Sequence, residues 1–155
     1  MVSPKSEPVL VARAEINAPL QDTRRWFLEL SEHPERYEFE SHEGFTFTEG
    51  AFGEPGAKFK TQEHFMGVTQ TLRFRLTEIE EHQFTFELRH PINEIWGRFV
   101  LNEITTDTTE LRLEIGGNTQ SKRILLKMPV ISQAIRSQIS REVEHIKLSI
   151  ERTRE

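Results

Sequence analysis

The 155-residue chain contains no cysteine, a single tyrosine and no long apolar run. The absence of cysteine excludes disulfide scaffolds, thiolate metal sites and cysteine nucleophiles. No stretch approaches eighteen consecutive apolar residues, and no apolar signal segment follows Met1, so we expect neither membrane insertion nor secretion. The expected location is therefore the cytoplasm.

Phenylalanine is the main large aromatic residue, with eleven copies in a chain that is 35% hydrophobic and 29% charged. This composition excludes collagen-like repeats and wholesale disorder. The net charge of −5 is uneven, since residues 1–117 hold 12 Lys and Arg against 21 Asp and Glu, whereas residues 118–155 hold 8 against 4. A basic terminal segment on an acidic body favours charge complementarity within the molecule, and we expect no nucleic-acid partner.

The N-terminal part of the chain predicts a strand followed by two short helices. Residues 1–8 are polar with two prolines and are expected to form a flexible tail before a single domain at residues 9–153. Apolar alternation over residues 10–16 predicts the strand. An apolar stripe over residues 20–30 predicts the first helix, and the segment at residues 34–37 predicts the second.

The remainder predicts a run of strands and then one long helix. Between residues 39 and 117 the apolar period is two, which indicates six further strands joined by hairpins. After Asn118 the period returns to 3.6 and predicts a C-terminal amphipathic helix, which Pro129 either kinks or separates from a shorter one. The expected hairpin partners are Phe59 with Phe74 and Glu63 with Gln70 around a turn at residues 66–67, and His90 with Ile95, Leu88 with Gly97 and Phe86 with Phe99 around a loop at residues 91–94.

This order of elements predicts an α+β domain in which a curved, seven-stranded antiparallel sheet wraps around the long C-terminal helix, with two short helices after the first strand. A strongly twisted sheet does not sit flush on a straight helix, so space is expected between them. A ligand pocket there typically has a volume of about 300–1,000 Å³. The alternative is that the phenylalanines meet the helix as a solid core.

Several local features accompany this order. Ile16-Asn17-Ala18-Pro19 closes the first strand, Trp26 lies in the first helix, Pro34-Glu35-Arg36-Tyr37 forms the second, a Gly50–Gly56 loop joins two strands, and the terminal helix runs from Ile131 to Glu151. Over residues 8–153 the chain thereby resembles the START-like superfamily, also called SRPBCC or helix-grip, which includes polyketide cyclase/dehydrase-like and lipid-transfer members. The resemblance implies a cavity that holds a small, largely apolar ligand.

The candidate ligand-binding side chains are those that the strand alternation and the helix period direct toward this space. Most are Phe, Leu or Ile, and Glu63, Gln70 and His90 are the polar groups expected to orient a ligand. The full set is Phe59, Thr61, Glu63, Phe65, Gln70, Leu72, Phe74, Phe84, Phe86, Leu88, His90, Phe99, Met128, Ile131, Ile135 and Ile139.

Glu63 and His90 are also the candidate catalytic groups. Glu63 lies in phase with Phe59 and Phe65, so its carboxyl group is expected to point into an apolar face, where burial raises the pKa and a neutral acid can donate a hydrogen bond or a proton. The alternative is a position at the rim of the sheet, in contact with water. His90 is either an acid/base partner of Glu63 or a rim residue bonded to a loop.

Motifs for a metal or a cofactor are missing. The six histidines show neither His-X-X-X-His nor His-X-His spacing. The glycine-rich segment at residues 50–56 matches neither the dinucleotide-binding nor the P-loop pattern, and it lies between strands. We expect no metal and no cofactor, and we interpret the segment as a flexible lid over the cavity mouth with Phe52 at its tip.

Three functions fit these features. The first is binding of a small hydrophobic or amphipathic molecule, for carriage or sequestration. The second is an enzyme of the polyketide cyclase/dehydratase or isomerase type that uses a pocket acid or base. The third is a protein-interaction module of the co-chaperone kind that uses the outer sheet face and Trp96. The sequence leaves the ligand's identity and the oligomeric state open.

Overall fold

The computed structural model describes residues 7–38, 42–65, 67–90, 95–118, 123 and 129–154. The tail expected at residues 1–8 lies almost entirely outside these ranges. The described elements are β1 (Leu10–Ile16), α1 (Leu20–Leu28), η1 (Pro34–Tyr37), β2 (His42–Glu49), β3 (Lys58–Phe65), β4 (Val68–Ile79), β5 (Gln83–His90), β6 (Ile95–Thr105), β7 (Thr108–Gly117) and α3 (Pro129–Thr153).

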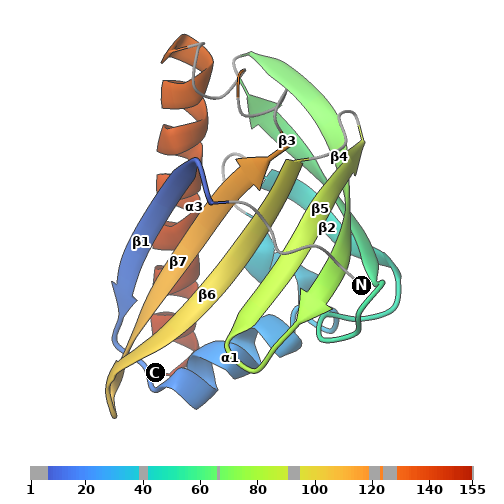
Figure 1. Ribbon diagram of the computed structural model, residues 1–155. Helices are drawn as coiled ribbons and strands as arrows, with labels where there is room; N and C mark the ends of the chain where they lie inside the picture. Colours follow the sequence, from blue (N-terminus) through green and yellow to red (C-terminus); the bar gives the residue numbers. More distant parts are fainter. Residues whose placement is uncertain are drawn as a thin grey trace.

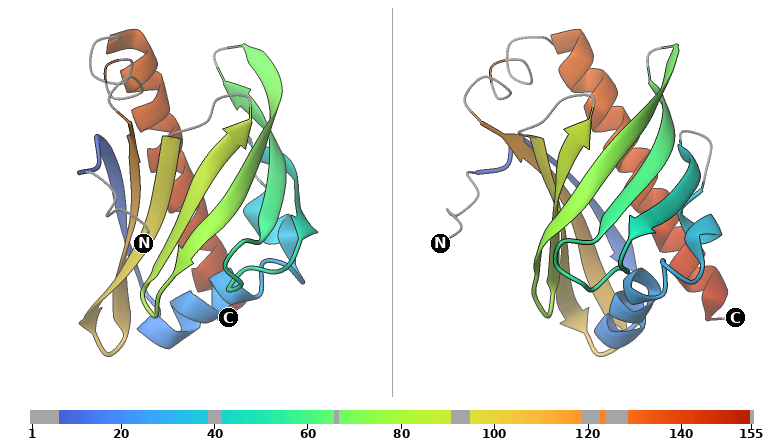
Figure 2. Two further views of the ribbon diagram at one scale, coloured as in Figure 1. Left: turned by 45° about the vertical axis from the view of Figure 1, so that its right-hand side comes forward. Right: turned by 90° about the vertical axis from the view of Figure 1, so that its right-hand side faces the viewer.

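The strands form one antiparallel sheet in the order β1-β7-β6-β5-β4-β3-β2 (Figure 1). Strands β2 to β7 follow one another as hairpins, and β1 pairs with β7 beside the last hairpin. Register shifts occur between β2 and β3, between β4 and β5 and between β6 and β7, and such irregularities bend a sheet. The sheet curves around α3, which crosses its concave side (Figure 2). The predicted α+β helix-grip architecture is confirmed.

The observed helices differ in detail from the predicted ones. The first predicted helix is α1, whereas the second is a single 3-10 turn, η1. Helix α3 is described from Pro129, a residue that suits a first helical position because its missing N–H has no partner there in any case. Residues 124–128 lie outside the described ranges, so a kink or a split at Pro129 stays a prediction. Within the described residues, no helix is long and apolar enough to span a membrane.

The register is as predicted for one hairpin and wrong for the other. In β3 and β4, Phe59 pairs with Phe74 and Glu63 with Gln70, as expected. In β5 and β6, the predicted partners are wrong by two residues: Phe84 pairs with Phe99, Phe86 with Gly97 and Leu88 with Ile95, so Ile95 is not the partner of His90. A slip of two residues leaves every side chain on its predicted face.

The Phe86 ring explains the observed register. A Cβ atom at position 97 would overlap the far edge of that ring, so the ring occupies the space that a side chain would take. Pairing Phe86 with Gly97 therefore lets an aromatic ring lie flat against the neighbouring strand, whereas the predicted pairing would place Phe99 there.

The core is solid at the end of the molecule where α1 lies. The C-terminal half of α3 buries Val143, Ile146 and Ile150 almost completely. Trp26 of α1 joins them and donates a 3.0 Å hydrogen bond from its Nε1 to Oγ of Ser149. Along the sheet, α3 packs mainly on β1 and less on β7.

The side chain of Phe52 is packed in the core, and a movement of its loop as a lid stays a prediction. Phe52 is only 5% exposed, and its ring centroid lies 4.9 Å from that of Phe84 and 5.8 Å from that of Phe27. The loop that carries it is also tied to β4, where Leu76 N–H donates to the carbonyl of Ala57 at 2.8 Å. Tertiary packing has drawn the Phe52 side chain into the core, while Glu54, Pro55 and Gly56 of the same loop are exposed.

The contact between Phe86 and Gly97 can be tested by mutation. Gly97→Ala should lower the free energy of unfolding by about 1–3 kcal/mol, because the new methyl group forces the ring to move within a packed interior. Urea denaturation followed by circular dichroism measures this change. Adding Phe86→Leu removes the overlapping ring atoms, so the double variant should lose less than the sum of the two single losses. Additive losses would contradict this contact.

Candidate functional site

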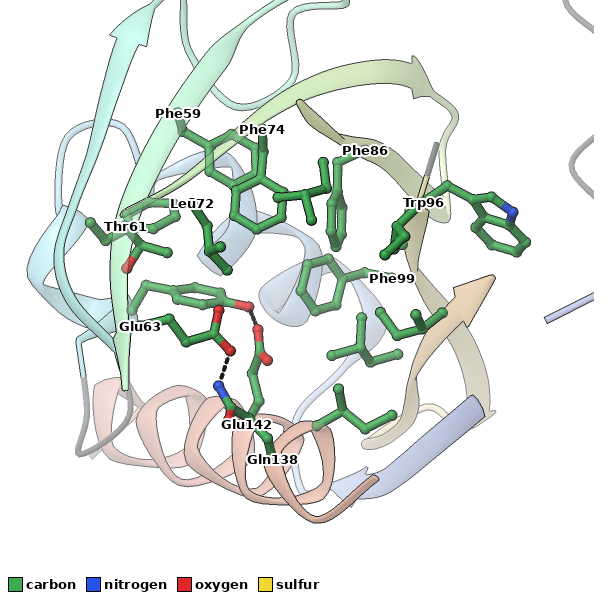
Figure 3. A pocket seen from close by; sticks show the side chains of 18 of the residues that line it. Phe59, Thr61, Glu63, Leu72, Phe74, Phe86, Trp96, Phe99, Gln138 and Glu142 are labelled. Carbon is green, nitrogen blue, oxygen red and sulfur yellow. Dashed lines mark hydrogen bonds between the residues drawn. The ribbon is translucent and has the colours of Figure 1, made fainter. Parts of the chain in front are cut away.

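A cavity of about 230 Å³ lies between the concave face of the sheet and the N-terminal half of α3 (Figure 3). It is smaller than the expected range because aromatic rings occupy much of the space. The lining residues are Tyr37, Phe45, Phe52, Phe59, Thr61, Glu63, Gln70, Leu72, Phe74, Phe86, Leu88, Ile95, Trp96, Gly97, Phe99, Leu113, Ile115, Ile135, Gln138, Ile139 and Glu142.

The sheet side of the cavity is a wall of contacting rings. Phe59 of β3 stacks on Phe74 of β4 with centroids 5.0 Å apart, and the Phe74 ring meets that of Phe86 edge-on at 5.5 Å. Phe86 in turn lies 5.5 Å from Phe99 of β6. These side chains point to one face because residues two apart on a strand share a face, and pairing carries that face across β3 to β6.

The helix side of the cavity mixes apolar and polar groups. Ile135, Gln138, Ile139 and Glu142 occupy positions i, i+3, i+4 and i+7, so they lie on one face of α3. This face is less apolar than the face that continues toward the C-terminus through Ile146. The cavity therefore has aromatic walls on the sheet side, where Thr61, Glu63 and Gln70 are the polar exceptions, and a mixed apolar and polar wall on the helix side.

Two hydrogen-bonded pairs make up the polar end. The Tyr37 hydroxyl donates to Oε1 of Glu142, and Nε2 of Gln138 donates to Oε1 of Glu63. The carboxyl groups of Glu63 and Glu142 come from β3 and α3, and both point into the same part of the cavity (Figure 3). Tyr37 is held in place by its ring, which stacks on Phe45 at 4.8 Å.

Burial shifts the acid–base properties of all three titratable groups. Desolvation, together with the nearby charge of Glu142, raises the pKa of Glu63 to about 8. Desolvation raises the pKa of Glu142 to about 7, against the opposing effect of the hydrogen bond from Tyr37. Burial and the adjacent carboxylates hold the pKa of Tyr37 well above its ordinary value. Near neutral pH the two acids are therefore partly protonated, in a site where the tyrosine stays neutral.

Most of the predicted ligand-binding residues line the cavity. Glu63 points inward and is only partly exposed, in place of the rim position that was the alternative. Whether these residues contact a ligand stays a prediction. The predicted residues that line the cavity are Phe59, Thr61, Glu63, Gln70, Leu72, Phe74, Phe86, Leu88, Phe99, Ile135 and Ile139.

The other predicted residues are not part of the described lining. Phe84 is fully buried in the solid core, with its ring 5.5 Å from that of Phe27, because it lies further along β5 toward α1. Ile131 is partly buried on α3 but does not line the cavity. Met128 and the side chains of Phe65 and His90 lie outside what the structure describes, so the catalytic role predicted for His90 stays untested.

The sequence interpretation missed the helix acid and its partners. Gln138 and Glu142 are four residues apart, and they directly precede Ile139 and Val143 of the apolar stripe, which marks them as inward-facing polar residues. Tyr37 was named only among the residues that carry the resemblance to the START-like superfamily, and not as a site residue. The other residues missed in the lining are Phe45, Phe52, Ile95, Trp96, Gly97, Leu113 and Ile115.

Trp96 contributes little side chain to the cavity, because its indole points away from it (Figure 3). The ring packs against Gly116 and lies under the guanidinium of Arg98, 5.0 Å from its centroid, so that Trp96 is 4% exposed. It is therefore covered on the outer face where the interaction-module hypothesis required an exposed contact. In the described part of the chain, no three histidine, aspartate or glutamate side chains gather as a metal site would require.

Replacing the two acids tests the electrostatics of the site. The folded protein keeps protons on Glu63 and Glu142 at pH values where the unfolded chain, with carboxyl pKa values near 4.5, releases them. The favourable contribution of these two acids to the free energy of unfolding is fully present below about pH 4.5, and it is lost as the pH rises through 7 and 8. Between pH 5 and pH 8, Glu63→Gln/Glu142→Gln should therefore gain more than about 1.4 kcal/mol of unfolding free energy relative to wild type, the equivalent of one pKa unit.

Urea denaturation at a series of pH values measures this difference. Glu144→Gln is the matched control, because Glu144 is an exposed residue on the same helix, and it should follow the wild-type profile. Parallel profiles for the double variant and the wild type would contradict the pKa shifts.

Comparison with known proteins identifies the fold. No family model matches the sequence, and no curated protein matches it. Among solved structures, a Thalictrum norcoclaurine synthase mutant in complex with a transition state analogue is 10% identical, with a TM-score of 0.69 over 97% of this chain and 100% of that one. A START superfamily protein from Mycobacterium smegmatis is 15% identical, with a TM-score of 0.61 over 92% of this chain and 93% of that one.

A third similar structure is the di-domain ARO/CYC BexL from the BE-7585A biosynthetic pathway. It is 14% identical, with a TM-score of 0.65 over 92% of this chain, and the chain spans about half, 49%, of its length. At such low identity these likenesses concern the backbone alone. Together with the sheet order and the position of α3, they show that the chain has the START-like, helix-grip fold.

Proposed function

We propose that the protein binds a small hydrophobic or amphipathic molecule in the cavity between the sheet and α3, and carries or sequesters it. The observation that supports this most directly is the lining itself, which is mostly aromatic and aliphatic and has few carboxyl and amide groups, Glu63 and Gln70 from the sheet and Gln138 and Glu142 from α3. Ligand sites typically combine an apolar surface with a few polar groups that orient the ligand. Among the similar structures, the norcoclaurine synthase mutant holds a transition state analogue.

Apolar burial would supply most of the affinity. Removing apolar surface from water contributes about 25 cal/mol per Å², from which the costs of association are subtracted. The ring surfaces of Phe59, Phe74 and Phe86 are already ordered by their mutual contacts, so little side-chain freedom is lost on binding. A compact ligand with one polar end fits this division of the walls.

A cavity-filling variant tests this proposal. Leu72→Trp places a larger side chain in the cavity from β4 and should weaken binding of 4-phenylbutan-1-ol at least tenfold in isothermal titration calorimetry. Leu148→Trp is the control, because Leu148 is 45% exposed on α3 and faces away from the cavity. Native mass spectrometry of freshly purified protein, followed by solvent extraction, should reveal a co-purifying apolar compound. If no probe binds and no compound is extracted, the proposal is wrong.

The second candidate function is an enzyme of the polyketide cyclase/dehydratase or isomerase type. The observation that favours it is the Glu63–Glu142 pair, whose raised pKa values place a proton donor and a proton acceptor in one apolar cavity near neutral pH. Tyr37 would orient Glu142 through its hydrogen bond. The interaction-module hypothesis is less well supported, because the interior is hollow and Trp96 is covered.

Comparing co-purifying compounds separates an enzyme from a carrier. Glu142→Gln keeps the shape of the side chain but cannot move a proton, and loss of such a group typically slows turnover about 10²–10⁴-fold. An enzyme should therefore carry mainly product in the wild-type protein and accumulated substrate in the variant. Identical extracted compounds from the two proteins would favour the carrier.

A further inference from the structure

The outer face of the sheet, which is the side turned away from α3 (Figure 2), carries positive charge over β3 and β4. Lys60 stands directly opposite Arg73, and Lys58 stands opposite Arg75. The residue between the two cations on each strand lines the cavity, so the cations themselves point outward. Four positive charges therefore lie together on two adjacent rungs of one strand pair.

A β-bulge brings a fifth positive charge to this place. The register between β4 and β5 shifts after Arg73, and Arg89 is the extra residue of β5 at that point. A bulge redirects a side chain, and Arg89 is exposed. These five cations are called the basic patch below: Lys58, Lys60, Arg73, Arg75 and Arg89.

Acidic residues flank one rung of the basic patch. Nζ of Lys58 lies 3.3 Å from Oε2 of Glu49, which belongs to the edge strand β2. On the other side, Glu87 of β5 stands opposite Arg75 in the register. This rung therefore has a carboxylate on each side.

The other rung has no acid beside it in the register. Thr46 of β2 stands next to Lys60, and His90 of β5 stands next to Arg73. Among the residues that the structure describes, no carboxylate lies within ion-pair distance of Lys60, Arg73 or Arg89. Like charges directly opposite each other destabilise a sheet, so this rung lowers the stability of the fold until an anion binds there.

The neighbouring half of the outer face is arranged differently. Nη2 of Arg98 on β6 lies 2.8 Å from Oε1 of Glu114 on β7. The guanidinium nitrogens of Arg112 lie 3.7 Å from carboxylate oxygens of Glu110 and Glu114. The charges of that half neutralise one another, whereas the basic patch offers unbalanced cations to a partner.

The charge of the whole chain favours one kind of anionic partner. The net charge is −5, and it is −10 without the five cations of the basic patch. A membrane surface or a long nucleic acid spreads its charge over an area that also meets this acidic remainder. Single-stranded nucleic acids in addition stack on exposed aromatic rings, whereas Trp96 on the outer face is covered. A short acidic segment reaches the patch without that repulsion.

The spacing of the cations suits an extended peptide. Residues two apart on a strand are separated by about 6.6 Å, and the same distance separates alternate residues of an extended segment. Acids at every second position therefore match the two rungs of the basic patch. A guanidinium group also binds a carboxylate through two parallel hydrogen bonds.

We propose that the basic patch is a docking surface for an acidic segment of a partner protein, which lies on it in extended form with carboxylates at alternate positions. This surface is on the opposite side of the sheet from the cavity, so it goes beyond the proposed ligand-binding function. It also differs from the surface of the interaction-module hypothesis, which used Trp96.

Fluorescence anisotropy with two labelled ten-residue peptides tests this inference. One peptide alternates glutamate with serine, and the other alternates glutamine with serine. The acidic peptide should bind in 50 mM NaCl, and the glutamine peptide should not. The affinity of the acidic peptide should fall about tenfold or more in 300 mM NaCl, because salt screens exposed charges.

Arg73→Glu separates loss of binding from loss of folding. It replaces the repulsion across the rung by an attraction to Lys60, so it should not lower the melting temperature, yet it should weaken binding of the acidic peptide at least tenfold. Arg141→Glu is the control, because it makes the same change of charge at an exposed position of α3, and it should weaken binding less than threefold. Neither variant should change binding of 4-phenylbutan-1-ol in the cavity.

The outcomes are distinct from those of the ligand-binding proposal. Equal binding of the two peptides, no binding of the acidic peptide, or equal losses in the two variants would overturn the docking surface. Tighter binding of a six-thymidine oligonucleotide, or of vesicles with about 30% phosphatidylserine, than of the acidic peptide would overturn it as well. None of these results bears on the cavity, which the alcohol probe tests separately.

Discussion

The mismatch between a straight helix and a strongly curved sheet determines the interior of this molecule. Helix α3 packs along β1 and β7 at one side of the sheet, and its C-terminal half fills the core with Val143, Ile146 and Ile150. Its N-terminal half faces β3 to β6 across the cavity. One helix thus completes the core at one end and forms a wall of the cavity at the other, so core packing and the cavity lining draw on different residues of the same element.

Much of the sheet side of the site could be predicted from the sequence, because alternation along a strand assigns a face to each residue. The face survives even where the register is wrong. Phe86 and Leu88 line the cavity although the predicted β5–β6 pairing was off by two residues, since only an odd slip exchanges the faces. Glu63 was placed inward by the same argument. The fold class followed from the order of strands and helices.

The helix side and the loops could not be predicted in the same way. The helical period predicts which side of the helix is apolar. It does not predict whether residues at the edge of that side, such as Gln138 and Glu142, face the interior and contact other side chains. Tyr37 and Glu142 are 105 residues apart, and no local pattern brings them together. Phe52 illustrates the same limit, because a glycine-rich loop predicts freedom of the backbone, whereas packing of its one large side chain on Phe84 buries it.

Two buried acids in an aromatic cavity oppose folding as the pH rises, and such costs are characteristic of functional sites.

The central claim is that this cavity takes up a ligand. Titrating methyl-labelled protein with 4-phenylbutan-1-ol, followed by nuclear magnetic resonance, tests it most directly. The account predicts saturable shifts of the Leu72, Leu88 and Ile139 methyl signals and none for the exposed Leu148. Shifts confined to surface methyl groups, or no saturable shifts at all, would contradict it.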